Sequence, residues 1–284
     1  MPPLNSCSSF WRREPMPALI FRSRWVRGGA LQDAPSLRVF LLDYLEQVDP
    51  AAAARVGLEV LKRMDSSDEW ALALRSVAKF DPSAQSRALL EEKMRQIFSH
   101  EPWQQNPSSS YLESFDVAVH LGCSDLLPDL TRMLRMTNNQ AVAHAAFLAT
   151  DRLVQRDPTP VLAALLTEPG MMEGREATRA NYFARADVSN TDQRRLVQNY
   201  LLNPRTTESE LDTFADSFPN ENSMLSNNLL TKSATRSGSQ IQARDTQTLG
   251  IINAWLQDPR FKGVIPQLNT IRSRLESFLA KPAP

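Results

Sequence analysis

From residue 36 onward, apolar residues recur at the spacing of an α-helix. In the segment 36–48 they fall three, four, seven, eight and eleven residues after the first one, and they are Leu37, Phe40, Leu41, Tyr44, Leu45 and Val48. This spacing places them in one stripe, typical of an amphipathic helix whose apolar side packs against its neighbours. Similar runs follow down to residue 279, and alternating β-branched runs are few. We therefore predict an all-α chain of about eleven or twelve helices.

The predicted helices are separated by a repeated dipeptide. Asp-Pro occurs at residues 49, 81, 157 and 258, each time between two apolar helical runs. An aspartate can accept a hydrogen bond from a free N–H at a helix start, and proline fits the first helical position because its missing N–H needs no partner. Two further starts have capping-box spacing, Ser66 with Glu69 and Thr207 with Glu210.

Three of the Asp-Pro junctions can be placed in register. Equivalent apolar positions then lie nine, eight and four residues before the aspartate: Phe40, Leu72 and Leu148; Leu41, Ala73 and Ala149; Leu45, Val77 and Leu153. This pattern resembles the helical-pair repeats of the HEAT and armadillo superfamily. The resemblance implies a right-handed α-α superhelix, a HEAT-like solenoid whose stacked helical pairs share a continuous core. The alternative is that Asp-Pro is simply a good helix start that recurs without repetition.

Composition divides the chain into an N-terminal arm, residues 1–35, and a helical repeat domain, residues 36–284, with a polar loop near 217–240. Within the arm, residues 10–27 combine five arginines with the aromatic residues Phe10, Trp11, Phe21 and Trp25. We expect this arm to be partly extended or disordered. Its aromatics could pack across the first helices, or stack on nucleic-acid bases.

Charge and motif content exclude several classes of function. The chain has 32 Lys plus Arg and 32 Asp plus Glu, so no overall field attracts nucleic acid or an anionic membrane. It has 9 glycines and lacks the glycine-rich phosphate loops, the nucleophile elbow and the metalloprotease motif. Charge is nevertheless segregated, because residues 208–221 are acidic and contain no Lys or Arg. We predict no cofactor.

Two sets of residues are candidates for binding chemistry. Arg175, Arg179 and Tyr182 fall four and seven residues along one predicted helix, where they could present guanidinium groups and a phenol to an anion. His120 and Cys123 share another helix and could hold a metal together with His144, although Cys123 is more often a small buried residue and His144 a packing histidine in such settings.

These observations favour a non-catalytic scaffold or adaptor that binds another protein or a peptide through its concave face. One alternative is a HEAT-like protein that binds or processes nucleic acid. A second is the helical domain of a bacterial envelope lipoprotein, because Leu4-Asn5-Ser6-Cys7 resembles the end of a lipoprotein signal and would make Cys7 a lipidation site of a truncated signal. No apolar run reaches the roughly 20 residues of a transmembrane segment, and we expect a cytoplasmic protein by default.

Overall fold

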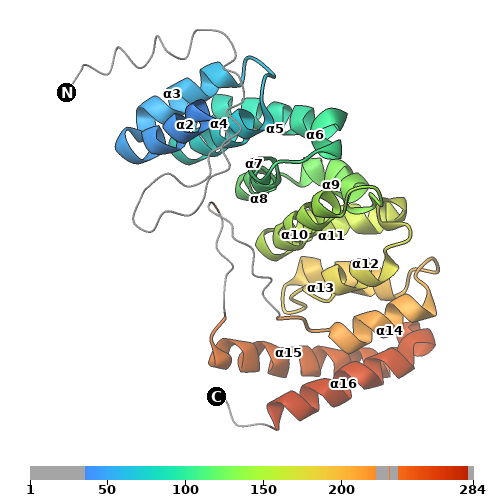
Figure 1. The fold of residues 1–284 in the computed structure, drawn as a ribbon. Helices are drawn as coiled ribbons and strands as arrows, with labels where there is room; N and C mark the ends of the chain where they lie inside the picture. The colour runs from blue at the N-terminus through green and yellow to red at the C-terminus, as the bar shows by residue number, and fades with distance from the viewer. Residues whose placement is uncertain (1–35, 222–229, 231–235, 281–284) are drawn as a thin grey trace, which may run out of the picture. The chain divides into compact units, whose positions relative to one another are not determined.

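The computed structural model describes residues 36–221, 230 and 236–280, and it is helical throughout (Figure 1). The all-α prediction is confirmed for these residues, which form no strand. The predicted arm, residues 1–35, and residues 222–229 and 231–235 of the predicted polar loop lie outside the described part. Across that part, no helix combines the length and the apolarity needed to cross a membrane.

The chain divides into two compact units. The N-terminal unit consists of residues 1–129, 136–146 and 228–231, and the C-terminal unit consists of residues 130–135, 147–227 and 232–284. The boundary between them passes through two helices, α9 (Leu127–Leu134) and α10 (Gln140–Arg156). The superhelical arrangement, and a single repeat domain over residues 36–284, stay predictions.

The N-terminal unit is built around one central helix. Its helices are α2 (Leu37–Val48), α3 (Pro50–Val60), α4 (Ser67–Phe80), α5 (Ala84–Ser99), α6 (Glu101–Gln105), α7 (Ser109–Glu113) and α8 (Phe115–Leu121), followed by the 3-10 helix η1 (Ser124–Leu126). Helix α4 contacts α2, α3, α5, α7 and α8 and buries every residue from Glu69 to Ala78 (Figure 1). Gly57 allows α3 to approach it closely, because a Cβ there would lie 3.0 Å from Val77 Cγ2.

In the C-terminal unit, several helices pack on the next but one helix along the chain, and the last two α-helices pack on each other. The unit contains α11 (Pro158–Thr167), η2 (Pro169–Met172), α12 (Glu176–Phe183), α13 (Thr191–Leu201), α14 (Glu208–Ser217), α15 (Gly238–Gln257), η3 (Pro259–Val264) and α16 (Ile265–Leu279). Contacts join α11 to α13, α12 to α14 and α14 to α16, whereas α15 packs on the adjacent α16. This alternation is what stacked helical pairs produce, so the unit is compatible with an α-solenoid.

The core of the C-terminal unit is rich in aromatic rings. Phe183 and Tyr200 stack with ring centroids 4.1 Å apart, and Phe214 stacks on Phe218 at 4.9 Å. All four side chains are buried. Offset and stacked aromatic pairs contribute beyond their buried area, which favours a fixed arrangement of α12, α13 and α14.

There are somewhat more helices than predicted, because several predicted helices are divided. For example, the helical run over residues 109–121 is divided at Ser114 into α7 and α8. It ends at Gly122, whose φ of 61° is the left-handed conformation that commonly closes a helix. The segment 124–136 begins as η1 and becomes α-helical at Leu127, so Pro128 lies in the first turn, where it is tolerated.

The Asp-Pro junctions all lie at helix boundaries, but they do not all act in the same way. Asp49 caps α3 by accepting a hydrogen bond from the Ala52 N–H at 2.9 Å, as predicted. Asp258 similarly accepts from the Arg260 N–H at the start of η3. Asp81 differs: α5 begins two residues later than expected, capped by Ser83. Asp157 precedes Pro158 of α11 without a side-chain capping bond.

Both predicted capping boxes are only half formed, for the same reason. Ser66 and Thr207 cap α4 and α14, but the glutamate of each motif, Glu69 or Glu210, is bound to an arginine instead of the cap residue. Arg38 lies 3.0 Å from Glu69, and Arg179 lies 2.7 Å from Glu210. In each unit the arginine precedes its glutamate by 31 residues and lies two helices earlier. The same arginine–glutamate spacing therefore occurs once in each unit.

Candidate functional site

Helix α2 buries two charged and two apolar residues, and it leaves its long apolar stripe on the outer side. Its buried residues are Arg38, Val39, Leu42 and Glu46. The stripe predicted to pack inward instead points out, with Leu37 43% exposed, Tyr44 53% exposed and Val48 53% exposed. Its remaining members, Phe40, Leu41 and Leu45, are half-buried. The expectation that this stripe packs against the neighbouring helices is therefore wrong for its outer residues.

The orientation of α2 is set by ion pairs with α4. The Arg38 guanidinium pairs with Glu69, and Glu46 accepts hydrogen bonds from Arg75 Nε at 3.0 Å, from Ser76 Oγ at 3.2 Å and from the Lys79 ammonium. A buried charge without a partner is strongly unfavourable, so Arg38 and Glu46 favour the orientation in which they, with Val39 and Leu42, face inward. The apolar stripe is consequently left on the opposite side of the helix.

The pKa shifts of Glu46 and Arg75 agree with the ion pairs between α2 and α4. Burial raises the pKa of Glu46, but hydrogen bonds and positive charge from Lys79 and Arg75 outweigh that effect, so its pKa lies below the ordinary value. Burial lowers the pKa of Arg75, and the carboxylates of Glu46 and Asp43 more than compensate, so its pKa is raised. Both groups are charged at neutral pH, and they hold α2 as an ion-paired element.

The outer side of α2 is an ordered apolar surface with an acidic residue at its edge. The rings of Phe40 and Tyr44 lie with centroids 6.3 Å apart and an interplanar angle of 13°. Asp43 lies at the edge of this surface, where it pairs with Arg75 and keeps 49% of its side chain exposed. The other polar residue on this part of the helix, Gln47, is exposed and uncharged. We call the six stripe residues together with Asp43 the α2 outer face.

A carboxylate from a neighbouring helix adds to the acidic character of that edge. Glu113, at the end of α7, has an oxygen 3.9 Å from Arg75 Nη1, and 50% of its side chain is exposed. Burial raises the pKa of Glu113, and the charges of Arg75 and Asp43 act on it in opposite directions. Three carboxylates in this cluster pair with only two cations: Glu46, Asp43 and Glu113 with Arg75 and Lys79. The cluster beside α2 therefore has more negative than positive charge.

The predicted anion-binding residues do not form an exposed site. The Arg179 guanidinium is buried and binds both carboxylate oxygens of Glu210, at 2.7 and 2.8 Å, and Glu210 also accepts a hydrogen bond from Tyr200. Tyr182 is buried and donates to the Phe147 carbonyl at 3.2 Å. Arg175 is exposed and lies before the first turn of α12. Of the three, only Arg175 presents its side chain to solvent.

The three metal-ligand candidates are held in separate settings. His120 Nε2 lies 3.2 Å from the Ala78 carbonyl, Cys123 is buried, and His144 is exposed on α10. Burial and the charge of Glu91 raise the pKa of the Cys123 thiol, which disfavours the thiolate that a metal would need. Within residues 36–221 and 236–280, no three His, Cys, Asp or Glu side chains are grouped to hold a metal ion.

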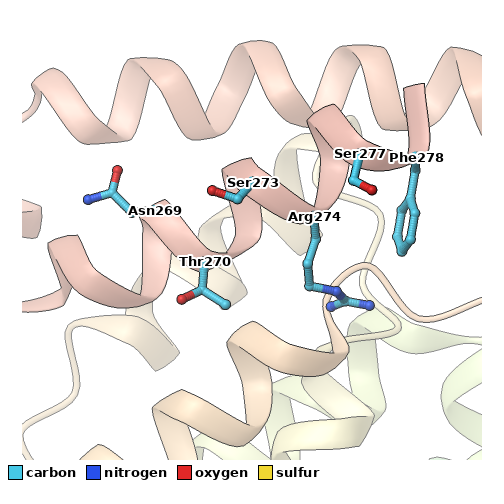
Figure 2. Close-up of a pocket in the computed structure, with 6 residues that line it drawn as sticks. All are labelled: Asn269, Thr270, Ser273, Arg274, Ser277 and Phe278. Atoms are coloured by element: carbon cyan, nitrogen blue, oxygen red, sulfur yellow. The ribbon is translucent and has the colours of Figure 1, made fainter. Parts of the chain in front are cut away.

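A shallow groove runs along one side of α16 (Figure 2). It has a volume of about 540 Å³ and is lined by Asn269, Thr270, Ser273, Arg274, Ser277 and Phe278. Arg274 is directed toward the end of α14, where it donates to the carbonyls of Ala215 at 3.1 Å and Phe218 at 2.9 Å. The Arg274 guanidinium thus pairs with carbonyl groups at the end of a neighbouring helix. The other lining residues are Asn, Thr, Ser and Phe, and none of them is an ionisable group.

Comparison with known protein families, with curated proteins and with solved structures found no match to this chain. The sequence predicts the apolar stripe of α2 but not the direction in which the stripe faces. The available signal was the pair of charges within the same helix, Arg38 and Glu46, eight residues apart on the side opposite the stripe. These two charges indicate the buried side of α2 only once Glu69 and Arg75 of α4 are known to pair with them.

Proposed function

We propose that the protein is a non-catalytic interaction module, and that the α2 outer face binds an apolar, basic segment of a partner protein. The observation that supports this most strongly is the outward direction of the stripe on a helix that is held by buried ion pairs. Large apolar side chains on a surface helix are usually turned toward the core, so an exposed and continuous set indicates a binding surface.

The exposed apolar residues are concentrated on this helix. Of the six large hydrophobic residues that are exposed in the described part of the chain, three belong to α2; the six are Leu37, Tyr44, Val48, Met64, Leu202 and Phe278. Leu37 to Val48 spans about 17 Å along the helix axis. A partner helix of about three turns, with anchors at the same spacing, could cover a stripe of this length.

Charge selects between classes of partner. Asp43 is the one charged residue of α2 that is not buried, and it is acidic. Glu113 adds a second half-exposed carboxylate nearby. Complementary charge steers association and fixes orientation, so a partner with Arg or Lys beside its apolar anchors is favoured. The same carboxylates repel a phosphate backbone, which favours a protein partner over nucleic acid at this face.

The proposal can be tested with two synthetic helical peptides that share one apolar stripe and differ only in flanking residues, arginine in one and glutamate in the other. Binding to the full chain is measured by fluorescence anisotropy. Two carboxylates, Asp43 and Glu113, at roughly 0.5 kcal/mol each predict about fivefold tighter binding of the arginine peptide. The substitution Tyr44→Ser should weaken that binding, whereas Met64→Ser, at an exposed site off this face, should not.

Equal binding of the two peptides, or binding that Tyr44→Ser leaves unchanged, would contradict the proposal. Circular dichroism of each variant checks that the fold is retained. Because Tyr44 is more than half exposed, its replacement is expected to leave the helical signal intact.

A further inference from the structure

The chain carries its own candidate ligand for the α2 outer face. We propose that residues 10–27 bind this face within the same molecule and compete with the partner protein. The competition rests on the proposed function, because it requires that a partner binds the α2 outer face. The contact between residues 10–27 and α2 can be tested by itself.

Residues 10–27 have the chemistry that the face selects. They contain five arginines, one glutamate and four aromatic residues, Phe10, Trp11, Phe21 and Trp25. The face offers apolar side chains and a stacked pair of rings, with the carboxylates of Asp43 and Glu113 along one edge. Aromatic residues can pack on the stripe, and guanidinium groups can pair with the carboxylates.

The connection to α2 is long enough for this contact. Eight residues, 28–35, separate the segment from Ser36, which caps α2 by accepting from the Val39 N–H. Eight extended residues reach about 26–29 Å, whereas the stripe is about 17 Å long. Gly28 and Gly29 open the connection, and glycine readily adopts the backbone conformations of a chain reversal.

Tethering makes such a contact competitive even if it is intrinsically weak. A short flexible connection gives a local concentration in the millimolar range. A partner then binds only the fraction of molecules whose face is open, and its apparent affinity falls by that fraction. Removing the internal ligand should therefore tighten partner binding, with no new contact to the partner.

The contact is tested by photo-cross-linking in the full chain with Tyr44→p-benzoylphenylalanine, which keeps an aromatic ring at the exposed position. Peptide mass spectrometry locates the adduct. The expected result is an intramolecular cross-link to residues 10–27 in the monomer band, at a yield independent of protein concentration. Met64→p-benzoylphenylalanine, exposed in the same unit but off the face, is the matched control and should give at least about fivefold less of this adduct.

Three results would overturn the inference. The first is the absence of a cross-link from position 44 to residues 10–27. The second is equal cross-linking from positions 44 and 64, which would indicate indiscriminate contact. The third is a cross-linked dimer whose yield rises with concentration, which would show that a second copy of the chain occupies the face.

A binding measurement separates this inference from the proposed function. Replacing the four aromatic residues of the segment with serine in the full chain should tighten binding of the arginine-flanked peptide by about tenfold. Leu4→Ser, outside the segment, is the control and should leave it unchanged. If the peptide binds both proteins equally, the competition is wrong and the proposed function stands. If it binds neither, the proposed function fails, while the cross-link still decides whether the contact exists.

Discussion

At the scale of single residues, buried charges determine how the helices of each unit are oriented. Arg179 and Glu210 keep 7% and 0% of their side chains exposed and form a two-point ion pair. Burial raises the pKa of the neighbouring Tyr200 well above its usual value, so its hydroxyl stays protonated and can donate to Glu210. The three groups satisfy one another inside the C-terminal unit.

The substitution Arg179→Ala should therefore destabilise the protein. It leaves the Glu210 carboxylate buried without its main partner, which typically costs about 3–5 kcal/mol. Arg175→Ala, at the exposed end of the same helix, should change stability by less than about 0.5 kcal/mol. Urea unfolding followed by circular dichroism measures both. Similar small effects would mean that Arg179 is not the internal ion-pair partner described above.

A second residue-level prediction concerns pH. Because the folded-state pKa of Glu46 is lowered, the stabilisation that it provides is complete above the ordinary glutamate pKa and is lost as the pH falls through the lowered value. Glu46→Gln should be less stable than wild type by about 1.5–3 kcal/mol at neutral pH. Below a pH of about 4 this difference should shrink.

Comparing the two proteins separates Glu46 from acids that do not share its partners, Arg75 and Lys79. Burial raises the pKa of Glu69 despite Arg38, and that of Asp151 despite Arg185, whose Nε lies 2.6 Å from Asp151 Oδ1. These two groups therefore act on stability in the opposite sense, but equally in both proteins. A wild-type-minus-variant difference that stays constant between pH 7 and pH 3 would contradict the predicted role of Glu46.

At the scale of the element, α2 provides an internal comparison between its two sides. Leu42 is 1% exposed, so Leu42→Ala should cost about 2–5 kcal/mol through lost burial and a residual cavity. Val48→Ser, on the outer face, should cost less than about 0.5 kcal/mol. Thermal unfolding of the two variants distinguishes them. A larger loss for Val48→Ser would mean that the stripe packs inward.

The same helix shows how much of the fold could be predicted from sequence. The helix over residues 36–48 and the N-cap of the following helix at Asp49 are determined by local spacing and by hydrogen bonds within a few residues, and both are confirmed. The direction of α2 does not follow, because it depends on Glu69 and Arg75, which lie about thirty residues away in sequence. The candidate anion site failed to form an exposed surface for a similar reason, because Arg179 is paired with the distant Glu210.

At the scale of the whole molecule, stability should be organised by unit. Each unit contains an arginine on one helix paired with the first-turn glutamate of the helix two further along, Arg38 with Glu69 and Arg179 with Glu210. Hydrogen exchange in the native state should therefore respond locally: Arg179→Ala should accelerate exchange in α12–α14 much more than in α2–α4. Arg38→Ala should give the reverse pattern, and uniform acceleration by either variant would contradict this organisation.

The central claim is that the outer face of α2 is a binding surface. The most direct measurement compares binding of the arginine-flanked peptide to four full-length proteins: wild type, Leu37→Ser, Tyr44→Ser and Leu202→Ser. All three positions are exposed, but only the first two belong to the face. The account predicts that Leu37→Ser and Tyr44→Ser each weaken binding by about tenfold, whereas Leu202→Ser leaves it unchanged. Equal affinity across all four proteins, with unchanged helical content, would contradict the account.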